Sequence, residues 1–247
     1  GGTLTSAGVV PTPAIAFVTP RMGYSAGVVI SASHNPFEEN GIKGFSGAGE
    51  KFTQRLEEHV ESIVADSSWG LDDAGRSESG ADAGTTATAG SGSDPVDRID
   101  CRSEYISHLL RIVQPEHRHR SIRIAVDCAN GATTTVAPRL FAELGFDVTY
   151  IGCEPDGRNI NLGCGSTATD LLAATVVEGG YQLGIAYDGD GDRVIFVGPD
   201  GHVVDGDAVM LMCAKQLKAE GRLTGSAIVA TVMSNIGLEL ALRDAGI

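Results

Sequence analysis

The sequence has no run of apolar residues that approaches the roughly 18 needed to cross a membrane as a helix. It also has no opening segment of the kind that directs secretion. Its five cysteines are scattered, without a Cys-x-x-Cys pair or the cysteine and histidine spacing typical of zinc ligands. We therefore expect free thiols, a reducing environment and a cytoplasmic protein without a membrane span.

Basic residues are scarce, because 18 Lys and Arg stand against 32 Asp and Glu, a formal net charge of −14 at pH 7. A surface this acidic repels phosphate backbones and anionic lipids, so we predict neither a nucleic-acid nor a membrane partner. A small anionic substrate would need a local cationic pocket or a metal ion. The sequence gives no indication of the oligomeric state.

The order of predicted elements indicates tandem three-layer α/β/α domains with mixed, largely parallel sheets. Residues 66–96 are rich in Gly, Ser, Ala, Asp and Thr, which predicts a flexible linker or insertion between domains. Apolar periodicity predicts helices at 14–19, 53–65 (with Thr53 as a possible cap), 103–113, 133–144, 169–177, 207–219 and 236–245. Strands are expected at 27–30 (continuously apolar and buried), 41–45, 122–127, 146–151, 183–187, 194–197 and 227–232.

An acidic loop, Asp188-Gly189-Asp190-Gly191-Asp192-Arg193, directly follows one predicted strand, at the sheet edge where open α/β sheets hold their sites. Three like charges within five residues repel one another unless a cation neutralises them. An EF-hand calcium loop is excluded, because it needs Gly at its sixth position and Glu at its twelfth. The alternative is a plain hairpin turn. We predict that Asp188, Asp190 and Asp192 hold a hard divalent ion such as Mg²⁺.

A second polar stretch, SASHNP at residues 31–36, ends the strand predicted at 27–30. A phosphorylated Ser33 would supply a further anionic ligand to the ion held by the acidic loop. A hydrolytic Ser-His pair is the rival interpretation, but neighbours on an extended segment point to opposite sides, and no Gly-x-Ser-x-Gly elbow is present. Taken alone, the stretch could equally be a polar turn. His34 is therefore assigned an orienting role.

Lys43 follows shortly, in the segment Asn40-Gly41-Ile42-Lys43. A lysine near a bound phosphate can pair with it, or act as a general acid or base if its pKa is depressed. The alternative is an ordinary solvated lysine.

SASHNP with NGIK, followed about 155 residues later by DGDGDR, resembles the motif pair of the α-D-phosphohexomutases. Within that family the chain is most similar to the bacterial enzymes that act on glucosamine phosphates. Further stretches that support this are 126–132, 155–157, 159–161, 164–167, 204–207 and 231–235. The chain begins with Gly1 rather than methionine, and we expect it to be an internal fragment of such an enzyme.

The resemblance implies a role for each matching position. Ser33 would be the phosphoserine and would share Mg²⁺ with Asp188, Asp190 and Asp192. Arg193 would contact the phosphate of the serine. Lys43 would be the candidate acid or base, with His34 in support.

The resemblance also implies an activity and a division into domains. The activity is the interconversion of glucosamine 6-phosphate and glucosamine 1-phosphate through a 1,6-bisphosphate, feeding UDP-N-acetylglucosamine synthesis. A phosphomannomutase or phosphoglucomutase of the same family, or an inactive metal-binding fragment, remains open. The expected parts are residues 1–65 (domain 1), 66–96 (linker), 97–206 (domain 2) and 207–247 (start of domain 3).

Overall fold

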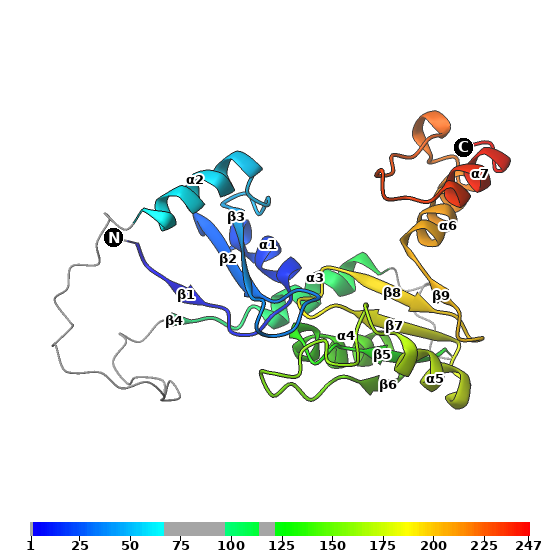
Figure 1. The fold of residues 1–247 in the computed structure, drawn as a ribbon, viewed down its shortest axis with the longest axis horizontal. Helices are drawn as coiled ribbons and strands as arrows, with labels where there is room; N and C mark the ends of the chain where they lie inside the picture. The colour runs from blue at the N-terminus through cyan, green and yellow to red at the C-terminus, as the bar shows by residue number, and fades with distance from the viewer. Residues whose placement is uncertain (1, 67–96, 114–121) are drawn as a thin grey trace.

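A computed structural model of the chain describes residues 2–66, 97–113 and 122–247 (Figure 1). The helices are α1 (Thr12–Arg21), α2 (Gln54–Ala65), α3 (Arg102–Ile112), α4 (Ala137–Leu144), α5 (Asp170–Gly179), α6 (Gly206–Ala219) and α7 (Ile236–Asp244). The strands are β1 (Thr5–Ser6), β2 (Ala26–Ser31), β3 (Gly41–Ser46), β4 (Asp97–Arg98), β5 (Arg123–Asp127), β6 (Asp147–Ile151), β7 (Leu183–Tyr187), β8 (Val194–Val197) and β9 (Val203–Val204). No helix within the described ranges combines the length and the apolar character needed to span a membrane.

The largest sheet is mixed, with strand order β6-β5-β7-β8-β9. Strand β5 pairs in parallel with both β6 and β7, while β8 and β9 run antiparallel to their neighbours. Helices cover both faces, because α4 packs on one side of β5 and β7 and α5 packs on the other. This arrangement is the three-layer α/β/α domain expected from the sequence.

The alternation of side chains along β5 explains why two separate cores form. Ile124 and Val126 point toward Phe141 on α4, whereas Ala125 points toward Leu172 on α5. Successive side chains of a strand face opposite sides, so a strand covered on both faces carries apolar residues throughout. Because β5, β6 and β7 run parallel, their carboxyl ends lie at the same edge of the sheet, and the acidic loop follows β7 there.

The N-terminal part contains a second, smaller sheet in which β2 and β3 pair antiparallel. Helix α1 packs against this sheet and against α3, which joins the first part of the chain to the second. The strand predicted at 27–30 is confirmed as part of β2, but the expectation that it is buried along its length was wrong. Val29 is buried, but Val28 and Ile30 are 60% and 73% exposed, because the described residues place a helix over only one face of β2.

The helix predicted at 133–144 is in fact two elements. A 3₁₀ turn covers Ala132–Thr135, and α4 begins only at Ala137, with Pro138 in its first turn. A proline has no N–H to donate and clashes with the carbonyl four residues earlier, so a helix accepts it only near its start. The proline therefore sets the beginning of α4.

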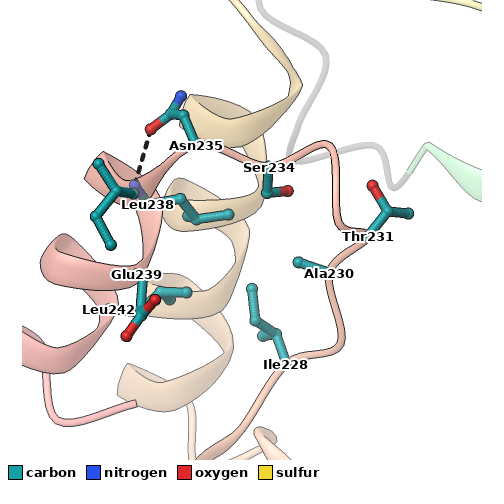
Figure 2. A pocket seen from close by; sticks show the side chains of 9 residues that line it. Ile228, Ala230, Thr231, Ser234, Asn235, Leu238, Glu239 and Leu242 are labelled. Carbon is teal, nitrogen blue, oxygen red and sulfur yellow. Dashed lines mark hydrogen bonds between the residues drawn. The ribbon is translucent and has the colours of Figure 1, made fainter.

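The strand predicted at 227–232 was also wrong, because this segment is irregular between α6 and α7. Ile228 and Ala230 line a cavity of about 430 Å³ with Leu238 and Leu242 of α7 (Figure 2). A strand must pair its backbone N–H and C=O groups with a neighbouring strand. In the part of the chain that the structure describes, no strand pairs with residues 227–232, and Val232 is fully exposed.

The remaining predicted helices and strands are confirmed to within a few residues. Thr53 occupies the position before α2, but its side chain forms no capping hydrogen bond. The strands β1, β4 and β9 were not predicted, because each has only two residues. All five cysteines are free thiols, as expected. The linker predicted at 66–96 lies, apart from Asp66, outside the described residues.

Candidate active site

Ser33 lies in a tight turn immediately after β2. Its backbone has a φ of +54°, in the left-handed region that residues with a side chain rarely occupy. This conformation raises the free energy of the folded state by about 1–3 kcal/mol. The hydroxyl oxygen of Ser31 accepts the N–H of Ser33 at 2.8 Å, and the N–H of Asn35 donates to the carbonyl of Ala32 at 2.9 Å. These local bonds hold Ser33 in a defined, strained conformation.

The acidic triplet, Asp188, Asp190 and Asp192, occupies the hairpin that connects β7 to β8. One ligand atom from each carboxylate lies within 4.8 Å of the others, and Asp188 and Asp190 are buried. The Oγ of Ser33 donates a hydrogen bond to Oδ2 of Asp188 at 3.2 Å. The serine and the triplet, 155 positions apart in sequence, therefore meet at one site.

Two donors from the second part of the chain hold the serine turn against the acidic loop. The carbonyl oxygen of Ser33 accepts the N–H of Gly189 at 3.0 Å and the side-chain amide of Asn161 at 2.9 Å. The same amide donates to the carbonyl of Asn35 at 2.8 Å. Asn161 was noted only as part of a resembling stretch, and its contacts with the turn could not be inferred from a spacing of 128 residues.

Lys43 reaches the triplet from β3. Its Nζ lies 2.6 Å from Oδ2 of Asp190 and 2.8 Å from Oδ2 of Asp192. Burial by itself would lower the pKa of Lys43, but hydrogen bonds and charge interactions with the two carboxylates outweigh it and raise the pKa. The structure therefore gives a charged ammonium, in the direction opposite to the depressed pKa that a general base would need.

The two buried carboxylates of the triplet respond differently to their surroundings. Burial raises the pKa of Asp188, and the neighbouring charges of Asp190 and Asp192 add to this effect. Burial also opposes ionisation of Asp190, but hydrogen bonds from Lys43 and Thr12 lower its pKa overall. Hydrogen bonds from an ammonium and a hydroxyl thus favour the ionised form of Asp190, and a bound cation would act in the same direction.

Arg193 lies beside the acidic triplet, and His34 directly follows Ser33 in the serine turn. Nε of Arg193 lies 3.9 Å from Oδ2 of Asp188 and 3.8 Å from Oδ1 of Asp192, and more than half of its side chain is exposed. The Nδ1 atom of His34 is buried without a hydrogen-bond partner in the structure. Arg193 thus lies beside the triplet with an exposed guanidinium, and its contact with a phosphate stays a prediction.

The oxygen atoms of the triplet fit a hard divalent cation. Three carboxylates converge, and the buried Oδ1 of Asp190 has no hydrogen-bond partner. Buried polar atoms are nearly always paired, so an unpaired carboxylate oxygen inside an acidic cluster is suited to a metal ion. The serine oxygen beside Asp188 adds a fourth donor of the same chemistry.

Glycines allow the acidic loop to lie directly on the turn after β5. The N–H of Ala132 donates to the carbonyl of Gly189 at 2.8 Å. A Cβ atom at Gly131 would lie only 2.1 Å from that same carbonyl oxygen. Gly131 is therefore required by close backbone approach, and its φ of −112° shows that backbone strain is not the reason.

Replacing Gly131 with alanine is expected to lower the free energy of unfolding by about 1–3 kcal/mol, because the clashing partner is backbone and must shift. Gly206→Ala is the matched control, since among the described residues nothing lies within 4 Å of a Cβ atom added to Gly206. Urea unfolding followed by circular dichroism measures both variants. Equal stability of Gly131→Ala and the unchanged protein would contradict the close approach.

The fold and the site define an α/β/α protein in which a serine from the first part of the chain meets a carboxylate cluster from the second. Family profiles described as phosphoglucomutase/phosphomannomutase, alpha/beta/alpha domains I, II and III match residues 1–70, 103–201 and 205–247. The three profiles follow one another in chain order and cover most of the sequence. The chain belongs to the phosphoglucomutase/phosphomannomutase family.

Curated relatives agree with this assignment. A protein named phosphoglucosamine mutase from Caldicellulosiruptor bescii is 41% identical over 253 residues, covering 100% of this chain and 52% of the relative. One of the same name from Heliobacterium modesticaldum is 44% identical over 250 residues, covering 100% of this chain and 54% of the relative. The chain thus spans about half the length of the curated relatives it matches.

Solved structures support the fold. A phosphoglucomutase/phosphomannomutase family protein from Burkholderia thailandensis superposes with a TM-score of 0.67 at 22% identity, covering 90% of this chain and 45% of the other. At this identity the likeness concerns the fold alone.

Proposed function

We propose that the chain is the serine- and metal-bearing part of a phosphoglucosamine mutase, an isomerase that moves a phosphoryl group between O6 and O1 of glucosamine phosphate. The observation that carries the proposal is the 3.2 Å contact between Ser33 Oγ and Asp188 Oδ2, which joins a nucleophilic hydroxyl to a carboxylate cluster. The names and the 41% and 44% identity of the two relatives support glucosamine as the sugar.

The proposed cofactor is Mg²⁺, held by Asp188, Asp190 and Asp192 together with the phosphate on Ser33. Magnesium prefers oxygen ligands, and it is bound in phosphoryl-transfer sites by one or two carboxylates together with phosphate oxygens. When bound, it would neutralise the charge that develops on the transferred phosphoryl group. The convergence of the triplet and the unpaired Oδ1 of Asp190 support this assignment.

In the proposed reaction, phosphorylated Ser33 gives its phosphoryl group to O1 of glucosamine 6-phosphate, which forms the 1,6-bisphosphate. The bisphosphate then reorients in the site, so that its O6 phosphoryl group faces Ser33. Transfer of that group to Ser33 releases glucosamine 1-phosphate. Phosphoryl transfer depends mainly on positioning and on neutralising charge. The strained turn at Ser33 and its bonds from Gly189 and Asn161 supply the positioning.

Lys43, Arg193 and His34 are proposed to assist the transfer. The raised pKa of Lys43 favours a charged ammonium, which suits a partner of the phosphate. As a proton donor to the leaving oxygen it would act only once its ion pairs with Asp190 and Asp192 are weakened, because these pairs are what raise its pKa. A cation bound by Asp190 and Asp192 would offset the negative charge that attracts Nζ, and so would free Lys43 to serve the substrate. Arg193 would pair with phosphate oxygens from its exposed position, and His34 would orient the serine turn.

We further propose that residues 1–65 belong to a first domain carrying the serine, 97–206 to a second carrying the acidic loop, and 207–247 to the start of a third. A site at the junction of two domains can exclude water when the domains close, which protects a phosphoserine and a bisphosphate from hydrolysis. The substrate is a small phosphosugar, and a cytoplasmic location is expected.

The activity is tested by steady-state kinetics of the intact protein with glucosamine, glucose and mannose 6-phosphates, in the presence of Mg²⁺ and the matching 1,6-bisphosphate. We expect kcat/KM for glucosamine 6-phosphate to exceed the other two by about tenfold or more, since a site that binds the amino group at C2 discriminates against sugars that carry a hydroxyl there. A preference for glucose or mannose phosphate would assign the protein to another mutase of the family. No turnover of any sugar would support the inactive metal-binding fragment.

A further inference from the structure

Asp190 is bonded on only one side of its carboxylate. Among buried side-chain nitrogen and oxygen atoms in the described ranges, three have no hydrogen-bond partner: His34 Nδ1, Asn161 Oδ1 and Asp190 Oδ1. By contrast, Oδ2 of Asp190 accepts from both Thr12 Oγ1 and Lys43 Nζ. A carboxylate with one crowded and one unpaired oxygen has a defined rotation, and what defines it decides which oxygen is offered to a ligand.

We propose that Thr12 is a positioning residue for the cation site, because its hydroxyl holds Oδ2 of Asp190 and thereby leaves Oδ1 for the metal ion. The inference rests on the cation site of the proposed function. It adds a residue from the first part of the chain that neither the motifs nor the resemblance singled out. Residues that orient metal ligands change metal affinity by about 10–100-fold when they are replaced.

Thr12 makes two separate bonds to the same aspartate. Its side-chain Oγ1 donates to Oδ2 of Asp190, and its backbone N–H donates to the Asp190 carbonyl oxygen at 2.8 Å. Only 4% of Thr12 and 2% of Asp190 are exposed, so water does not compete for these bonds. One residue thus fixes both the backbone and the side chain of a predicted metal ligand.

The backbone around Thr12 is well suited to this role. Thr12 is the first residue of α1 and stands between Pro11 and Pro13, whose rings restrict the chain on both sides. Gly191 packs against the ring of Pro11, since a Cβ atom added to Gly191 would lie 3.3 Å from the Cβ atom of Pro11. The amino end of α1 also places a partial positive charge beside Asp190, which favours an ionised carboxylate.

Lys43 contacts the same oxygen but acts differently. Its ammonium neutralises Asp190 and Asp192, and it ends a long side chain that can move away. A threonine hydroxyl orients Oδ2 without cancelling its charge, so the full negative charge of Asp190 stays available to a cation. The short, buried side chain also has few alternative rotamers. Orientation of the ligand is therefore assigned to Thr12 rather than to Lys43.

The test compares Mg²⁺ affinity, measured by isothermal titration calorimetry of the intact protein, for the unchanged protein, Thr12→Val and Thr12→Ser. Valine keeps the shape and the backbone bond but removes the hydroxyl, whereas serine keeps the hydroxyl. We expect about tenfold weaker Mg²⁺ binding for Thr12→Val and a change within about threefold for Thr12→Ser. Circular dichroism in EDTA checks that the variants are folded, and Thr12→Ala replaces Thr12→Val if the latter does not fold.

Equal affinity of Thr12→Val (or its alanine replacement) and the unchanged protein would overturn the inference while leaving the cation site intact. Equal weakening in Thr12→Ser would also overturn it, because that variant retains the hydroxyl and loses only a methyl contact. Absence of Mg²⁺ binding by the unchanged protein would overturn the cation site of the proposed function, and the inference with it. The outcomes therefore distinguish a failure of the role proposed for Thr12 from a failure of the proposed cation site.

Discussion

Ser33→Ala is expected to reduce the mutase activity of the intact protein by about a thousandfold or more, because the phosphoryl carrier is lost while the rest of the site stays intact. Alanine removes only the Oγ atom that donates to Asp188, and the bonds from Gly189 and Asn161 go to the backbone carbonyl, which remains. The measurement is the conversion of glucosamine 6-phosphate in the presence of Mg²⁺ and the 1,6-bisphosphate.

Mass spectrometry of the same preparations separates this role from a structural one. The unchanged protein should carry added phosphate on Ser33, and the alanine variant should carry none there. Ser62→Ala is the control, because Ser62 lies on α2, away from the site, and its hydroxyl donates to the carbonyl of His59. Full activity of Ser33→Ala, or phosphate transferred from the bisphosphate to another residue, would refute the phosphoserine.

Asp190→Asn is expected to weaken Mg²⁺ binding by about 100-fold, equivalent to about 2.7 kcal/mol. The change turns one of three converging carboxylates into a neutral amide of nearly the same shape, so the principal loss is charge at the cation. Because Asp190 is buried, solvent compensates for little of that loss. Calorimetric titration with Mg²⁺, at fixed ionic strength, measures the effect.

The control for this experiment is Asp147→Asn, since Asp147 is an exposed aspartate on β6 whose ion-pair partner is Arg123. It removes one negative charge from the chain without touching the triplet, so Mg²⁺ affinity should change by less than about twofold, as expected for a solvent-screened charge. If Asp190→Asn bound Mg²⁺ as tightly as Asp147→Asn does, the triplet would not be the ion site.

The predicted elements show where reasoning from the sequence succeeds. The strand that precedes Asp188 was placed at Leu183–Tyr187, as the structure has it, because a buried parallel strand is apolar throughout. The segment at 227–232 has similar apolar content, yet it forms no strand. Strand formation depends on a partner for the backbone, and a segment's own sequence does not specify whether one is present.

The residues of the candidate site also fall into two groups, those that the sequence indicated and those whose role only the structure shows. The glycines and aspartates of residues 188–192 indicated an oxygen-rich cation site without any structure, because charge repulsion within one loop is a local property. Thr12 and Asn161 were not assigned roles, although Thr12 contacts Asp190 and Asn161 contacts the serine turn. Nothing in their local sequence distinguishes them from an ordinary helix start or loop amide.

By itself, the sequence determined the α/β class, the acidic loop at a strand end and the serine after β2, since these follow from periodicity and from chemistry within a few residues. Only the tertiary structure decided that Ser33 lies 3.2 Å from Asp188, that Lys43 is charged among the carboxylates, and that Thr12 orients toward Asp190. These are contacts across well over one hundred residues. They arise from the packing of the first part of the chain against the second, which no local pattern of side chains encodes.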